Sequence, residues 1–547
     1  MSSLLRRTGA LAASVALLGA GLAVAAAPAQ AVGTDPRPVS VGASWLADHL
    51  VNGVIKDSYI DSFTDPNNPV PVEYDDLGLT MDTAMSLVAV GAHASTVATI
   101  KTAMDARITE TYDSFGTIYT GSAAKAAVYD RLVGGDPKNV NGTDLVKVVE
   151  DNTSATAPTV GKIQNVNDSF GDSNTFGQAF AVRALAEAGS TKAADAEAFL
   201  LKQQCTDGFF RLNPAAPAAL DQTCQATDGT DASAPDNDAT SIALIQLESL
   251  ATKSDAVKAS IQAGRQWLLD EQLPDGSFGG GPSTSAPNAN STGLAGIALA
   301  GTGDAAAAKA AAIWVRSLQA DEVGTCTSKL STQTGGIGYD AGTVAAGRAN
   351  GITFATKDRW LRTTAPVLPV LKYAPASTPN LNVLGPTSTV KGGSVVVYRI
   401  TGVVPGDKVC VYGLGRHKVV TGGADGRARV AFTMPNGTGS RTIVVSDRGG
   451  NSASIRTEIL GPKKLTVTAQ SQIQRGKVLP VTVTGLAPGE PVRVAWRGTT
   501  VRRGYADLHG VFRTSFGVGT TLGNGAVSAF GKWADIRKGY DVVKVVA

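Results

Sequence analysis

Aromatic, histidine and cysteine residues are all scarce in this chain of 547 residues. Aromatic residues make up 6% of it, which argues against an aromatic carbohydrate platform or an aromatic-lined hydrocarbon pocket. The four histidines are scattered, so we expect no metal site and no cofactor. Four cysteines are too few for a disulfide-held scaffold. With 43% hydrophobic and 17% charged residues, the chain is globular and long enough for several domains.

Long apolar runs are also missing, except at the N-terminus. Arg6 and Arg7 precede an Ala-rich apolar run over 11–27, and Ala29-Gln30-Ala31 is a small-residue cleavage site. This order is typical of a secretory signal peptide, with a membrane anchor as the alternative. We therefore predict a signal peptide over 1–31, a secreted extracellular protein, and no stable membrane span after its removal.

Acidic residues are sparse in the C-terminal third of the chain. Residues 376–547 hold 23 Lys and Arg against 8 Asp and Glu, a net charge of +15, whereas residues 1–375 carry −12. Such asymmetry concerns partners rather than fold. For a secreted protein we expect residues 376–547 to bind an anionic cell-wall or capsule polymer, and no nucleic acid. Solubility, or a drift in composition between domains, is the alternative.

The acidic part contains internal repeats. One unit over 265–279 reads as an amphipathic helix with Trp267 on its apolar face, followed by a Pro274-Asp275-Gly276 turn. Related segments occur over 199–210 and 314–339. With weaker copies at both ends, the spacing predicts six helix pairs between about residues 40 and 374.

A second helix with its own start signal follows each of these loops. Aligning Thr83, Thr175, Thr240 and Thr292 places an apolar residue five positions on in every copy, namely Val88, Phe180, Ile245 and Ile297. A second apolar position lies seven residues on, at Val90, Val182, Leu247 and Leu299. Asp, Asn and Thr before each stripe are typical helix N-caps.

The run containing Trp267, Gln272 and Asp275-Gly276-Ser277-Phe278 resembles the QW-type repeat of squalene and terpenoid cyclases. The paired-helix period is similar to that of the wider superfamily, which includes protein prenyltransferase β subunits. This resemblance implies an all-α (α/α)6 toroid over 40–374. Six outer and six inner helices would form two concentric rings around a hub cavity.

The chemistry of that superfamily matches this chain only in part. Protonating cyclases carry a D-x-D-D run whose middle acid protonates the substrate. Here Asp236-Asn237-Asp238-Ala239 places Asp238 at the middle acid and Ala239 at the fourth position. The prenyltransferase zinc needs Asp, Cys and His ligands, and the histidines of this part lie far upstream. Asp238 is therefore a weak catalytic candidate, and a helix N-cap is the alternative.

Parallel inner helices, as the resemblance implies, would bring their N-termini to one rim of the toroid. A ring of helix N-termini with carboxylate and amide side chains suits a polar ligand. Simple helix capping is the alternative. The predicted ligand or partner site at the rim consists of Asp82, Asn174, Asp236, Asp238 and Asn290.

The cysteines suggest one disulfide and leave a second open. Cys205 and Cys224 flank one loop and are a natural pair in an oxidising compartment. Cys326 lies in another loop and Cys410 in an expected strand. These two could bridge the helical part to the β part, or both could remain free and buried.

The basic part contains two matching blocks, in which Gly402 and Gly485 occupy equivalent positions 83 residues apart. Alternating apolar positions separated by Gly/Pro turns predict two all-β sandwiches, over 380–460 and 461–547. They resemble the bacterial immunoglobulin-like repeats of secreted proteins. The expected fold class is thus multidomain, a toroid followed by two immunoglobulin-like sandwiches.

These observations favour a secreted, non-catalytic binding protein of the cell envelope. The toroid rim would hold a ligand or protein partner, and the basic modules would tether the protein to the wall. One alternative is a secreted enzyme on the same scaffold, either a terpenoid cyclase using Asp238 or a polysaccharide lyase or glycosidase. Another is a purely structural envelope protein.

Overall fold

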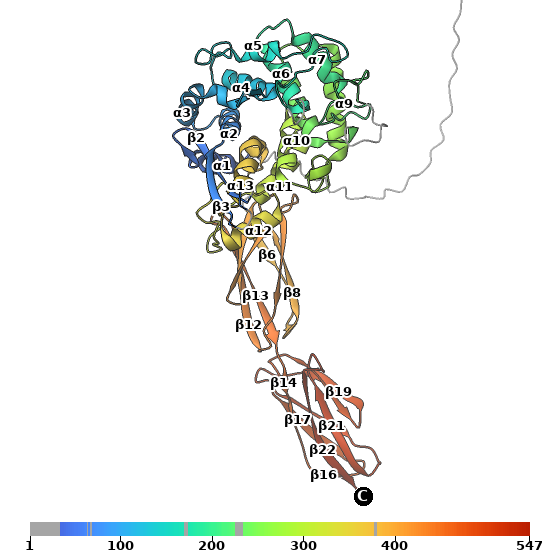
Figure 1. The fold of residues 1–547 in the computed structure, drawn as a ribbon. Helices are drawn as coiled ribbons and strands as arrows, with labels where there is room; N and C mark the ends of the chain where they lie inside the picture. Colours follow the sequence, from blue (N-terminus) through green and yellow to red (C-terminus); the bar gives the residue numbers. More distant parts are fainter. Residues whose placement is uncertain (1–32, 63, 66–67, 169–172, 225–232, 377–379) are drawn as a thin grey trace, which may run out of the picture.

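The computed structural model describes residues 33–62, 64–65, 68–168, 173–224, 233–376 and 380–547. The predicted signal peptide lies outside these residues. A helical N-terminal region precedes two β-rich regions that follow one another along the chain (Figure 1). In the described part of the chain, no helix is both long enough and apolar enough to cross a membrane.

The helical region contains thirteen α-helices within the described residues and a few short strands. The helices are α1 Arg37–Ala47, α2 Leu77–Val90, α3 Ala94–Asp105, α4 Thr120–Leu132, α5 Leu145–Asp151, α6 Thr175–Glu187, α7 Ala193–Lys202, α8 Asn237–Glu248, α9 Asp255–Glu271, α10 Ala289–Gly301, α11 Ala305–Leu318, α12 Ala341–Asn350 and α13 Lys357–Val367. The 3-10 helices are η1 Ile108–Thr111, η3 Pro282–Thr284 and η4 Leu368–Tyr373. The strands are β1 Leu50–Val51, β2 Val54–Asp61, β3 Val70–Asp75, β4 Asp113–Ser114 and β5 Thr117–Ile118.

Six of the helices contact one another in a closed cycle, which Figure 1 shows as a ring. Helix α2 contacts α4, α4 contacts α6, and the contacts continue through α8, α10 and α13 back to α2. We call these six the inner helices. Outside this cycle, α3, α5, α7, α9 and α11 each pack on the inner helix that precedes them. Side chains at matching heights pair between neighbours, Lys125 with Asp82 and Arg183 with Gln246, so neighbouring inner helices run parallel.

A buried threonine in four of the six helices of the cycle fixes the helix to a preceding loop or strand. The hydroxyl of Thr240 accepts the backbone N–H of Phe210 at 2.8 Å, and Thr292 accepts that of Phe278 at 2.9 Å. We call this position the repeat threonine; its four members, all with 0% exposure, are Thr80, Thr240, Thr292 and Thr364. In α6 Gln178 takes this role and accepts the Ile163 N–H at 3.0 Å, whereas the buried Thr120 and Thr175 donate to the carbonyls of Gln164 and Arg211. A buried N–H without such a partner would be costly, so the hydroxyl specifies the helix position.

The sequence alignment of Thr83, Thr175, Thr240 and Thr292 was wrong in two of its copies. In α6 the residue equivalent to Thr240 is Gln178, three residues after Thr175. Thr83 was aligned with the other threonines, but Thr80 accepts the backbone N–H of Ile55 at 2.9 Å. The Thr83 hydroxyl is buried and has no hydrogen-bond partner among the described residues. Helix α2 also begins earlier than the Met81-Asp82-Thr83 signal suggested, at Leu77, because Asp76 caps it by accepting from the Leu79 N–H.

The glutamine of the repeat links successive outer helices. Gln272 donates to the carbonyl of Gly276 in its own turn and to that of Ala307 in α11, at 3.1 and 3.0 Å. Gln204 makes the same pair of bonds onto α9, and Gln319 makes it onto α1. One amide therefore satisfies two backbone carbonyls and joins neighbouring repeats.

Charged residues close the ring between its last and first inner helices. Arg362 of α13 pairs with Asp76 at the start of α2 and, at 2.5 Å, with Asp358 of its own helix. Asp57 of β2 is fully buried beside the same guanidinium and accepts from the Tyr74 hydroxyl at 3.3 Å. Burial raises the pKa of Asp57 to about 6, and the hydrogen bond with Asp358 adds to the rise.

Two disulfides are present. Cys205 is bonded to Cys224, as the sequence predicted. Cys326 is bonded to Cys410, which settles the open alternatives for these two cysteines in favour of a bridge between the helical and first β regions. In the described part of the chain, no cysteine is free.

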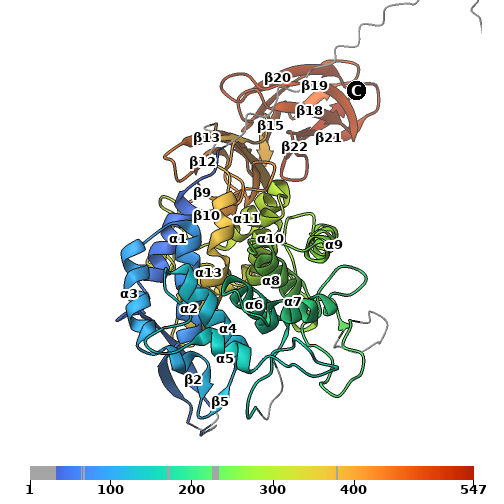
Figure 2. The same cartoon turned by 90° about the horizontal axis from the view of Figure 1, so that it is seen from above.

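Figure 2 shows the first β region against the helical region. Buried charges also hold this junction. Arg316 of α11, 4% exposed, pairs with Asp35 at 2.6 Å and with Asp407 at 3.2 Å. Arg448 reaches both Asp407 and, at 2.5 Å, Asp321. Burial opposes ionisation of Asp407, but Arg316 and Arg448 prevail and lower its pKa.

Each β region contains a larger and a smaller sheet. The first region runs β10-β9-β12-β13-β7 and β11-β8-β6, and the second runs β14-β22-β21-β18-β19, with β16 on β22, and β15-β17-β20. Alternate residues point inward, as in β8, where Tyr398 and Ile400 join one core with Ile443 of the opposite sheet. A separate core fills the second region.

The strands of the first region are β6 Asn382–Leu384, β7 Val390–Lys391, β8 Val395–Thr401, β9 Lys408–Gly413, β10 Arg416–Thr421, β11 Arg427–Thr433, β12 Gly439–Ser446 and β13 Ser452–Leu460. Those of the second region are β14 Lys463–Lys464, β15 Thr466–Ala469, β16 Gln472–Gln474, β17 Val478–Thr484, β18 Pro491–Trp496, β19 Thr499–Tyr505, β20 Phe512–Gly517, β21 Gly523–Phe530 and β22 Arg537–Val546.

Candidate functional site

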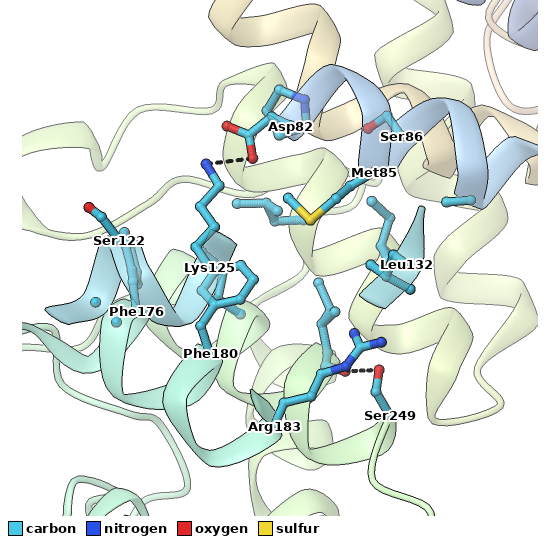
Figure 3. A pocket seen from close by; sticks show the side chains of 18 of the residues that line it. Asp82, Met85, Ser86, Ser122, Lys125, Leu132, Phe176, Phe180, Arg183 and Ser249 are labelled. Atoms are coloured by element: carbon cyan, nitrogen blue, oxygen red, sulfur yellow. Dashed lines mark hydrogen bonds and ion pairs between the residues drawn. The ribbon is translucent and has the colours of Figure 1, made fainter. Parts of the chain in front are cut away.

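A cavity of about 760 Å³ lies inside the ring of helices and is lined by side chains from all six of them and from η4 (Figure 3). Two layers of its lining follow from the repeat threonine. Residues two positions after it, together with the residues of α4 and α6 at the same distance from the helix cap, form one layer, namely Asp82, Lys125, Phe180, Ile242, Leu294 and Pro366. Residues one turn further along form the next, namely Met85, Arg183, Ile245, Ile297 and Pro369.

The layering is a consequence of helix geometry. Positions three residues apart lie on the same face of a helix, so both layers point to the centre of the ring. The position seven residues after the threonine faces the other way and is buried in the protein core, as Leu247 and Leu299 show. The apolar position five residues on, read from the sequence, is therefore a cavity position, and the one seven residues on is a packing position.

The polar groups of the cavity are concentrated on α2, α4 and α6. Lys125 pairs with Asp82 at 2.7 Å, and their side chains remain 22% and 28% exposed (Figure 3). Lys125 also donates to the carbonyl of Gly78. Farther along the cavity, Arg183 pairs with Glu187 at 2.7 Å.

The opposite wall is apolar. Helices α8 and α10 contribute Ile242, Ile245, Leu294 and Ile297 to it, whereas Phe176 and Phe180 of α6 lie beside Lys125 (Figure 3). The cavity thus has one charged side and one apolar side. Such a lining suits a molecule that has an apolar body and a polar end.

Two of the five residues predicted for the rim line this cavity. Asn174 is the N-cap of α6 and accepts the Gly177 N–H at 3.2 Å. Asp82 lies in the second turn of α2, not at its start, and its carboxylate already has Lys125 as a partner.

The other three predicted residues lie outside the cavity lining. Asp236 is the N-cap of α8 and accepts the Ala239 N–H at 2.9 Å. Asp238 and Asn290 are the second residues of α8 and α10, and one side-chain oxygen of each is buried without a partner among the described residues. Burial raises the pKa of Asp238 to about 6, while a hydrogen bond from Ser291 opposes the rise. Capping accounts for Asp236 but not for Asp238 or Asn290.

The sequence reasoning missed the charged side chains of the cavity, Lys125 and Arg183. Lys125 belongs to a unit too degraded to align. Arg183 lies eight residues after Thr175, a position that the apolar alignment did not consider. Lys125 lies six residues after Tyr119, the N-cap of its helix, as Asp82 and Ile242 lie six after Asp76 and Asp236, and this spacing is the signal that identifies it.

One group of side chains has the composition of a metal site. Cys326, Cys410 and His417 have ligand atoms within 4.8 Å of one another, the one such group found in the described part of the chain. Both sulfurs are joined in a disulfide and so provide no thiolate. The arrangement is a structural bridge with a neighbouring imidazole.

Comparison with known proteins gives low similarity. No family model and no curated protein matches the chain. Among solved structures, the type II terpene cyclase MstE from Scytonema is 13% identical and matches over 61% of this chain and 97% of its own, with a TM-score of 0.41. The Yersinia pseudotuberculosis adhesin InvE is 18% identical over 31% of this chain, with a TM-score of 0.17, and the match spans only 58% of the adhesin. Similarity at this level assigns no function.

Proposed function

We propose that the protein is a secreted, non-catalytic binding protein of the cell envelope, which holds an amphiphilic molecule in its helical ring. In this proposal the helical region is an α/α toroid, and the two β regions are immunoglobulin-like sandwiches that tether the protein to an anionic wall polymer. The polar rim around Asn174 is the entrance for the ligand or the contact for a partner.

The two-layered cavity is the observation that carries this proposal. Its volume of about 760 Å³ falls in the ordinary range of small-molecule sites, roughly 300–1,000 Å³. Among the described residues that line it, Asp82 is the one carboxylate, and it is neutralised by Lys125. This composition favours binding over acid–base chemistry, which needs a free proton donor or acceptor at the substrate.

The charged side of the cavity indicates which end of a ligand it would hold. Lys125 and Arg183 can donate to an anionic or hydroxylated end, while the isoleucines of α8 and α10 cover an apolar chain. Asp82 already neutralises Lys125, so an anionic end would have to compete for that ammonium group. A long-chain carboxylic acid carrying a fluorescent dansyl group is a suitable probe of both features.

Titration of the full-length protein with the dansyl fatty acid tests the proposal. The double variant Ile245→Trp and Ile297→Trp fills the cavity and should weaken binding by about tenfold or more. Ile60→Trp, on an exposed strand residue, is the matched control and should bind as the unmodified protein does. If the probe does not bind, or if the cavity-filling variant binds it equally well, the cavity is not the ligand site.

The enzyme alternative has one observation in its favour, the buried carboxyl of Asp238 with its raised pKa. A proton donor must reach its substrate, and Asp238 is not among the residues that line the cavity. Asp238→Asn separates the two readings. Loss of turnover on a polyprenyl or glycan substrate would favour an enzyme, whereas the binding protein would keep its affinity for the dansyl probe.

A further inference from the structure

The outer face of the larger sheet in the second β region carries a row of cations across five adjacent strands. Strand register aligns Lys464 of β14 with Lys538 of β22, Lys538 with Phe530 of β21, Phe530 with Arg493 of β18, and Arg493 with Arg503 of β19. Directly paired residues point to the same face of a sheet. We call these five residues the basic row.

The geometry of the row suits an extended ligand. Neighbouring strands lie about 4.8 Å apart, so the five side chains span roughly 19 Å across the sheet. Lys464, Lys538 and Arg503 are exposed. Arg493 is held in place, with its guanidinium 4.1 Å from the centre of the Phe530 ring and 3.0 Å from the Thr500 hydroxyl.

No carboxylate of the described residues forms a salt bridge with a cation of the basic row, although Asp535, which pairs with Lys391, lines the groove beside Lys464 and Lys538. Residues 461–547 contain 13 Lys and Arg but only four carboxylates. Glu490 is buried against Arg537, Asp507 pairs with Arg513, Asp535 pairs with Lys391, and Asp541 accepts the Ala469 N–H. In the described structure, none of the four cations of the row has a carboxylate within salt-bridge distance. Their charge is therefore available to a partner.

An exposed aromatic side chain lies beside the row. Tyr540, two residues after Lys538 on β22, is 70% exposed. Together with Lys464, Lys538 and Phe530 it borders a groove of about 460 Å³. A tyrosine face next to cations can stack on a sugar ring while the cations hold the acidic groups of neighbouring sugars.

We propose that the basic row and Tyr540 form a binding site for a linear acidic polysaccharide. The strands would lie across the polymer, with carboxylates bound by Arg493, Arg503 and the lysines, and a pyranose ring resting on Tyr540. The forked guanidinium matches a carboxylate with two hydrogen bonds. A polyol phosphate has no ring to stack on Tyr540, so a polysaccharide is the better fit. This inference rests on the wall binding that we propose for the β regions, and it assigns that binding to the basic row and Tyr540.

Binding of full-length protein to immobilised polygalacturonate tests the site. The triple variant Lys464→Gln, Arg503→Gln and Lys538→Gln removes three exposed cations and should weaken binding by about tenfold or more at low salt. The control triple Arg475→Gln, Lys477→Gln and Arg502→Gln removes the same charge from exposed residues of the same region, outside the row. It should weaken binding less than about threefold.

Tyr540→Ala and three other polymers complete the test. Tyr540→Ala should weaken binding by about fivefold and leave its salt dependence unchanged, because stacking is not a charge effect. A neutral glucan should not bind. Equal losses in the two triple variants, or an unaltered Tyr540→Ala, would overturn the site. Tighter binding of poly(glycerol phosphate) or of duplex DNA would overturn its assignment to a polysaccharide.

Retention on purified cell walls separates this inference from the proposed function. If walls retain the Lys464, Arg503 and Lys538 triple variant as well as the unmodified protein, the tether stands and the basic row is wrong. If walls do not retain the unmodified protein even at low salt, the tether of the proposed function fails. The dansyl titration of the helical cavity is independent of both outcomes.

Discussion

Replacing the buried carboxyl of Asp57 should stabilise the protein at neutral pH and have little effect in acid. In the folded protein burial raises the pKa of Asp57 to about 6, from a usual value of 3.8. Between these two values the folded state binds more protons than the unfolded state does. Stability therefore decreases as the pH rises from about 4 to about 6, and the penalty is complete above that range.

The size of the effect follows from the pKa difference. About two pKa units correspond to at most about 3 kcal/mol of unfolding free energy near pH 7.5. Asp57→Asn removes this penalty. The amide can still accept the Ser58 N–H, and it can donate to the neighbouring Asp358, where two carboxylates would repel. The substitution also removes the attraction between the Asp57 carboxylate and the Arg362 guanidinium, which lie 3.6 Å apart.

Urea unfolding followed by circular dichroism, at about pH 4 and about pH 7.5, measures the difference. Asp57→Asn should be more stable than the unmodified protein at the higher pH by about 1–3 kcal/mol, and nearly equal to it at the lower pH. Asp255→Asn, on a fully exposed side chain, is the control and should change neither value. A loss of stability of similar size at both pH values would refute the reasoning.

Two further predictions concern the repeat threonine and the junction. Thr80→Val should destabilise the protein by about 1–3 kcal/mol in urea unfolding, because it leaves the buried N–H of Ile55 unpaired. Thr83→Val, three residues on, should be neutral or stabilising. If instead Thr83→Val were the more destabilising variant, the alignment of Thr83 made from the sequence would be restored. The double variant Cys326→Ser and Cys410→Ser should keep both folded regions but speed limited proteolysis between them, and equal cleavage rates would show that the buried ion pairs alone hold the junction.

The order of helical and β regions could be read from the sequence because each depends on local patterns. The repeat around Trp267 gives the helical period, and alternation such as that of Val396, Tyr398 and Ile400 gives the strands. The pairing of Cys205 with Cys224 was also predictable, because one loop joins them. In each case, the residues that carry the signal are close together in the chain.

The register of α2 could not be read in the same way. Met81-Asp82-Thr83 has the composition of a helix start, and Asp82 is a typical capping residue. The true cap is Asp76. The position of the helix is fixed by the hydrogen bond between the N–H of Ile55, in strand β2, and the hydroxyl of Thr80. A contact between distant segments therefore overrides a local capping signal.

The degraded repeat contributes most to the character of the cavity. Lys125 occupies the cavity position that is filled by Ile242 in α8 and Leu294 in α10, and Asp82 of the neighbouring helix neutralises it. A lysine at this position removes the apolar pattern of the repeat. Its burial would be unfavourable without the Asp82 carboxylate as a partner. The same substitution makes one side of the cavity polar and leaves the other apolar, so a bound amphiphile could take only one orientation. The α4 repeat, which has lost the apolar pattern, is thus the repeat that makes the two sides of the cavity different.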